Sequence, residues 1–165
     1  MSSIFKPNLD RYTSARFVAP VDDYELEVTS VRPRQQEIKK GERAGQKMNI
    51  LTVNTKIVTA ANSGTEYTDK LVSFDFIINA EDDSFNRALR FAANCLGFQA
   101  GGPDAEKYDR EFIERYGDAD WSVDFEGGKV GAAWESLAKA RVNVVTKMGG
   151  NTEYPRADIA SSRPI

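Results

Sequence analysis

The segment YELEVTSV, residues 24–31, alternates apolar and polar side chains. Tyr24, Leu26 and Val28 occupy every second position, and a polar residue separates each from the next. Because successive side chains of a strand point to opposite faces, this period of two predicts a strand with one buried face. We therefore expect a β-rich domain in which this segment is the first strand.

Two more extended segments follow it along the chain. Residues 48–60 are rich in Ile, Leu, Val and Thr, and an Asn-Ser-Gly turn at residues 62–64 separates them from residues 66–79. β-Branched residues bounded by turn residues are typical of strands, so the two segments are expected to form a long hairpin. Phe74 and Phe76 share one strand face, which we expect to be buried.

Helical spacing appears next, at residues 85–96, where apolar side chains recur every three or four positions. Asp82 or Asp83 precedes this helix as its N-cap, and Gly97 is placed to end it. A second amphipathic helix is expected over residues 104–116, with its acidic side chains in solvent.

The remaining elements are short. We expect a segment with a Gly-Gly turn at 121–130, a short helix at 132–138, a strand at 140–147, a hairpin turn at 148–152 and an edge strand at 153–159.

This order of elements predicts a mainly β fold with inserted helices (α+β). It fits an OB-fold-like five-stranded Greek-key barrel with a helix between strands 3 and 4. The chain of 165 residues has the usual length of one domain. We divide it into an N-terminal arm (1–21), the OB-fold-like domain (22–160) and a short C-terminal tail (161–165).

The composition disfavours catalysis. The chain has no histidine and one cysteine, so the commonest acid-base group and thiolate metal sites are missing. The two common glycine-rich phosphate-binding motifs, G-x-G-x-x-G and G-x-x-x-x-G-K-[ST], do not occur. We therefore expect no enzyme, no catalytic residue, no cofactor and no metal. A carboxylate-dependent Mg²⁺ nuclease or phosphatase is a weaker alternative, because nine acidic residues lie within residues 101–126.

The same features suggest a cytoplasmic address. Cys95 lies in a helical pattern and has no partner for an intrachain disulfide, which suits a reducing compartment. The first residues lack the pattern of a secretory signal, and the apolar runs are too short to cross a membrane. We expect no membrane contact.

Residues 32–47 are the strongest candidate for a binding segment. Their proline, glycines and charges predict a long connecting loop, which carries six basic residues against two acidic ones. Basic side chains that neutralise phosphates supply most sequence-independent affinity for nucleic acids. A solvated connection without a binding role is the alternative.

Aromatic side chains near turns add stacking surfaces for bases, and Tyr67 and Tyr154 are the preferred candidates. Together with nearby basic residues they define an expected DNA-binding groove, made of Arg32, Arg34, Lys39, Lys40, Arg43, Lys47, Lys56, Tyr67, Lys147, Tyr154 and Arg156.

Four segments are similar in spacing to a known family: DYELEVTSVRPR (23–34), KMNILTVNTKIV (47–58), FNRALRFAANCLGF (85–98) and SLAKARVNVVTK (136–147). Together they resemble the OB-fold single-stranded-DNA-binding proteins encoded by tailed bacteriophages. The resemblance implies a non-catalytic protein that coats single-stranded DNA during phage replication or recombination, in the cytoplasm of the infected host. The resemblance also implies partners among the phage or host proteins of replication and recombination. Assembly of several copies into a homo-oligomer is a further expectation that the sequence leaves open.

The alternative is a phage-encoded protein-protein interaction or inhibitory module that uses the acidic surface of residues 101–126. A positive groove beside exposed tyrosines favours DNA binding, whereas a wholly negative surface favours this module.

Overall fold

The computed structural model describes residues 4–7, 9, 17–79, 83–150 and 154–165. Over these residues the fold is mainly β with three helices, an α+β arrangement. The elements follow in the order β1 (Asp23–Glu37), β2 (Lys47–Ala60), β3 (Leu71–Ile77), α1 (Ser84–Cys95), α2 (Ala105–Tyr116), β4 (Val123–Asp124), β5 (Lys129–Val130), α3 (Ala132–Glu135), β6 (Arg141–Gly150) and β7 (Pro155–Pro164). Within the described ranges, no helix is long and apolar enough to cross a membrane.

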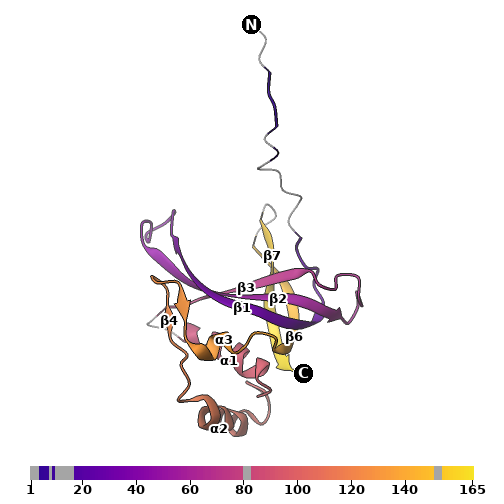
Figure 1. Cartoon of the computed structure of the whole chain (residues 1–165), viewed down its shortest axis with the longest axis vertical. Helices are drawn as coiled ribbons and strands as arrows, with labels where there is room; N and C mark the ends of the chain where they lie inside the picture. Colours follow the sequence, from indigo (N-terminus) through magenta and orange to yellow (C-terminus); the bar gives the residue numbers. More distant parts are fainter. Residues whose placement is uncertain (1–3, 8, 10–16, 80–82, 151–153) are drawn as a thin grey trace.

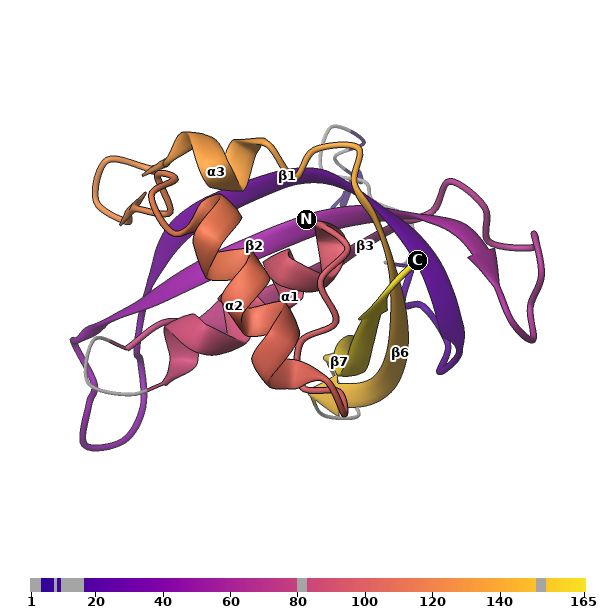
Figure 2. The ribbon, with the colours of Figure 1, turned by 90° about the horizontal axis from the view of Figure 1, so that it is seen from below.

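Five strands form one antiparallel sheet in the order β3-β2-β1-β6-β7, while β4 and β5 pair separately. The sheet is open, yet it curls so that its edge strands β3 and β7 approach each other. The helices lie on one side of the β1–β2–β3 layer (Figures 1 and 2). In the part of the chain that the structure describes, α1, α2 and α3 thus leave the opposite side of that layer uncovered.

Irregular pairing bends β1 so that it serves two partners. Its first residues, Asp23 to Glu27, pair with β6, and the whole strand pairs with β2 with register shifts at Glu25/Leu26 and Val28/Ser30. Such bulges increase strand twist and change which side chains face inward. Val28 and Val31 are consequently both buried, and Arg32 faces solvent.

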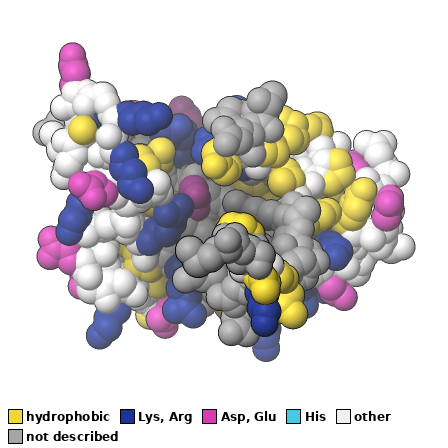
Figure 3. All heavy atoms as spheres, turned by 90° about the horizontal axis from the view of Figure 1, so that it is seen from above, with side chains coloured by type: hydrophobic (Ala, Val, Ile, Leu, Met, Phe, Trp, Pro, Cys, Tyr) yellow, Lys and Arg dark blue, Asp and Glu magenta, His cyan; other side chains and the backbone are white. Residues whose placement is uncertain are grey.

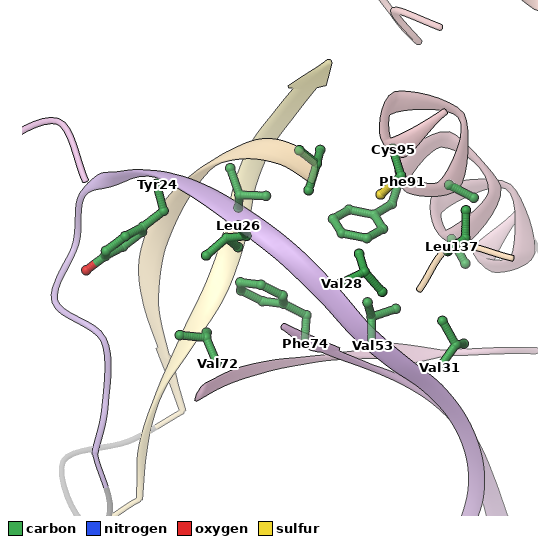
Figure 4. Close-up of a cluster of buried hydrophobic side chains, with 14 of the residues drawn as sticks. Tyr24, Leu26, Val28, Val31, Val53, Val72, Phe74, Phe91, Cys95 and Leu137 are labelled. Atoms are coloured by element: carbon green, nitrogen blue, oxygen red, sulfur yellow. The ribbon is translucent and has the colours of Figure 1, made fainter. Parts of the chain in front are cut away.

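The core fills the space between the curled sheet and the helices. Tyr24, Leu26 and Val28 are buried, which confirms the expected alternation of the first strand. The Phe91 ring of α1 points toward Val28 and Val53 (Figure 4). Phe74 is 2% exposed and Phe76 packs on Phe91 with ring centroids 5.8 Å apart, so their shared face is the inner one.

The predicted loop over residues 32–47 is correct in its middle and wrong at both ends. β1 continues to Glu37 and β2 begins at Lys47, which leaves residues 38–46 as the connection. The part of the hairpin near its tip projects beyond the stretch of β1 that pairs with β6. It therefore covers little of the core and needs few apolar side chains. Pro33 is tolerated there because that edge of β1 has no β6 partner.

Other boundaries also differ from the expected ones. β3 begins at Leu71, because residues 61–70 form turns, so the third strand is shorter than the expected 66–79. The two expected helices are present as α1 and α2, and Gly97 follows α1 with a φ of 92°. Left-handed backbone of this kind favours glycine and ends the helix.

The C-terminal hairpin is longer than predicted. Residues 148–150 belong to β6, and residues 151–153 of the expected turn lie outside the described residues. β7 runs to Pro164, so residues 161–164, assigned to a tail, pair with β6 instead. The segment SSRP (161–164) alternates exposed and partly covered positions at a sheet edge, and it contains no strongly apolar side chain. Its polar composition therefore gave no sign of a strand.

Part of the expected N-terminal arm is described. Phe17 packs on Tyr67 with ring centroids 5.4 Å apart, and Ala19 is buried in the core. Ile4, Phe5 and Leu9 are exposed, whereas residues 1–3, 8 and 10–16 lie outside the described ranges.

Candidate nucleic-acid interface

The side of β1, β2 and β3 that points away from the helices is here called the outer face. Its side chains alternate with core residues such as Val53 and Phe74. Register and burial assign to it Ser30, Arg32, Arg34, Gln36, Met48, Ile50, Thr52, Asn54, Lys56, Ser73, Asp75 and Ile77.

A hollow of about 700 Å³, here called the outer groove, lies between the outer face and the beginning of β7. All three strands of the outer face line it, and Tyr154 and Arg156 line it from the β7 side. Figure 3 views the molecule from this side and shows Lys and Arg side chains gathered on the half nearer the β1–β2 hairpin tip.

An ion pair fixes Arg34 within the groove. Its Nη2 lies 2.9 Å from Asp75 Oδ2, and Thr52 Oγ1 donates to Asp75 Oδ1 at 2.6 Å. Both charged side chains are more than 40% exposed, and exposed pairs are worth only about 0 to 1 kcal/mol. A phosphate that binds Arg34 therefore has little to displace.

Apolar side chains form the floor of the groove. Ile50 is 3% exposed although it lies on the outer face, and it pairs across the sheet with Ile77. Both residues line the groove together with Met48. The groove thus has an apolar floor beside its cations. The signal in the sequence was the pair Ile50-Leu51, because one of two consecutive apolar strand residues must face away from the core.

The hairpin tip presents the exposed cations Lys39, Lys40, Arg43 and Lys47, and the exposed Arg32 lies further back along β1, opposite Thr52. Among the described residues, none of the five is ion-paired. Ile38 N donates to Gln46 O at 2.8 Å, and Gly45 N donates to Ile38 O at 2.8 Å. These bonds order the turn, so the cations project from a defined backbone.

The expected site residues are only partly brought together. Arg34, Tyr154 and Arg156 line the outer groove, and Tyr154 is 71% exposed. Lys56 lies on the outer face but pairs with Glu27 at 3.2 Å. Tyr67 is half-buried against Phe17, outside the residues that line the groove.

The cysteine and the acidic segment lie outside the outer groove. Burial raises the pKa of the Cys95 thiol to about 12, so this side chain is a neutral part of the core. The acidic side chains of residues 101–126 are exposed or half-exposed. Within the described part of the chain, no group of His, Cys, Asp and Glu is arranged to hold a metal ion.

Neither models of known protein families nor curated proteins give a match to this chain. Its function is therefore inferred from the geometry of the outer face and its surroundings.

Proposed function

We propose that this chain is an OB-fold protein that binds and coats single-stranded DNA, without catalysis, in phage DNA replication or recombination. The sheet order supports the fold assignment: an OB fold is a five-stranded, partly open Greek-key barrel that binds nucleic acids on strands 2 and 3 and on the loops between strands 1–2 and 4–5. The five-stranded sheet order β3-β2-β1-β6-β7 and the position of α1 after β3 in the chain support this assignment.

The observation that carries the proposal is the position of the outer groove. It lies on β2 and β3, and the β1–β2 hairpin and the beginning of β7 flank it. These are the surfaces with which OB folds bind oligonucleotides. The four similar segments described above support the phage assignment.

The groove residues suggest how a strand is held. Cations of the hairpin tip and Arg34 neutralise phosphates, which releases counterions and drives sequence-independent binding. Ile77 and Tyr154, which are exposed in the groove, contact base faces, which are accessible in a single strand and hidden by stacking in a duplex. The protein then coats a strand without reading its sequence.

The test is a fluorescence-anisotropy titration of labelled poly-dT at low and moderate salt, with a duplex of equal length beside it. We expect preference for the single strand and a salt slope of about 0.7 per phosphate neutralised. Absence of salt-sensitive binding to the single strand would overturn the proposal.

A protein-protein module is the second candidate. Helix α2 lies on the side of the sheet away from the outer face (Figure 1). It has no buried residue, and most of its acidic side chains are exposed. Binding of neither DNA form in that titration would favour this module.

A further inference from the structure

A second hollow, of about 460 Å³, is here called the seam pocket. It opens where the edge strands β3 and β7 approach each other and where α1 packs against both. Phe76 of β3 and Phe91 of α1 line its apolar part. The pocket thus lies at the open edge of the sheet, beyond the outer face.

Basic side chains from three elements line the seam pocket: Arg87 and Arg90 of α1, Lys147 of β6 and Arg156 of β7. Arg87 and Arg90 are three positions apart, which places them on one side of the helix. Both are exposed, and neither forms an ion pair within the described ranges.

Two carboxylates in the pocket offset part of this charge. Asp75 pairs with Arg34 at 2.9 Å, and Asp158 pairs with Arg156 at 3.0 Å. Asp158 is also the cross-strand neighbour of Lys147. The positive charge that remains is concentrated on the two arginines of α1.

The seam pocket adjoins the outer groove. Asp75, Ile77, Arg156 and Asp158 line both hollows. A chain that lies in the outer groove can therefore pass over the beginning of β7 and meet α1 without leaving a surface that carries cations.

We infer that Arg87, Arg90 and Lys147 form a second phosphate-binding subsite, which holds the sugar-phosphate backbone of single-stranded DNA where it leaves the outer groove. This inference rests on the proposed function. The subsite lengthens the contacted strand around the open edge of the sheet, so long oligonucleotides gain contacts that short ones lack.

The test compares oligo-dT of about five nucleotides with oligo-dT of about twenty, lengths below and above most of the range bound by single OB folds. The double variant Arg87→Gln/Arg90→Gln removes two exposed cations. The matched control, Lys107→Gln/Arg110→Gln, removes two exposed cations from α2, outside both hollows. Thermal melting of each variant checks the fold.

We expect the Arg87/Arg90 variant to bind the long oligonucleotide about tenfold more weakly than the wild type, with a salt slope smaller by about 1.4. Its affinity for the short oligonucleotide stays unchanged, and the control variant matches the wild type at both lengths.

Three results would overturn the inference. Unchanged long-strand binding in the Arg87/Arg90 variant removes the subsite and leaves the proposed function intact. An equal loss at both lengths, or an equal loss in the control, indicates a general charge effect. Failure of the wild type to bind either length removes the proposed function as well.

Discussion

Asp22 connects the turn after β2 to the beginning of β1. This carboxylate is 4% exposed and accepts hydrogen bonds from Asn62 N at 3.1 Å, Ser63 N at 3.0 Å and Ser63 Oγ at 2.8 Å. Burial alone would raise the pKa of Asp22. The hydrogen bonds from Asp23, Ser63 and Asn62 lower the pKa by more than burial raises it, so the pKa lies below its usual value.

Asp22→Ala is expected to lower the free energy of unfolding by about 2 kcal/mol at neutral pH, because the turn loses its charged acceptor. The depressed folded pKa means that this contribution is present above the unfolded value of 3.8 and disappears as the pH falls through the folded value. Urea denaturation of the wild type and the variant, at neutral pH and at a pH below 3.8, checks this. The exposed Asp118→Ala is the control; an equal effect there would contradict this role.

Tyr154 is the aromatic residue best placed for stacking. Its side chain is exposed and lines the outer groove. Tyr154→Ala is expected to weaken single-strand binding by about 1 to 3 kcal/mol, whereas Tyr154→Phe keeps the ring and the affinity. Anisotropy titration measures both. If the Phe variant loses as much as the Ala variant, the hydroxyl group acts instead of the ring.

Among the elements, the β1–β2 hairpin carries most of the candidate charge. The triple variant Lys39→Gln/Lys40→Gln/Arg43→Gln is expected to reduce the salt slope of single-strand binding by about 2, since each phosphate contact contributes about 0.7. These side chains are exposed, so the melting temperature should stay unchanged. Binding equal to the wild type would identify the hairpin tip as a merely solvated connection.

Elements with a buried face were predictable from sequence. The alternation of Tyr24, Leu26 and Val28 and the helical spacing of residues 85–96 both follow from a core on one side, and both were confirmed. The extension of β1 through Arg34 was missed because a hairpin that projects from the core is held by backbone pairing, which leaves no apolar period.

For the candidate site, the sequence could predict which residue types take part but not how they are arranged in space. Clustered cations marked the hairpin, but sequence could not reveal that β7 approaches β3 and closes a groove. Arg87 and Arg90 were missed for the same reason, because solvent-facing charges on a helix resemble any other polar face. Tyr67 looked exposed, whereas Phe17, far away in sequence, covers part of its ring.

At the scale of the whole molecule, the two charge signs are unevenly distributed. The net charge is −3, yet the outer face and hairpin carry clustered cations, and the acidic segment 101–126 includes α2 on the helix side (Figures 1 and 3). On the proposed function, this distribution turns the cations of the β1–β2 hairpin toward the polyanionic strand. The acidic side then faces away from a coated strand.

The most direct test of this account maps the bound strand by NMR. At 18.3 kDa the ¹⁵N-labelled protein is suitable for an amide titration with oligo-dT. The account predicts shifts at the β1–β2 hairpin, at β2 and β3 and at the beginning of β7, with residues 101–126 unchanged. Shifts confined to residues 101–126, or no shifts at saturating DNA, would contradict it.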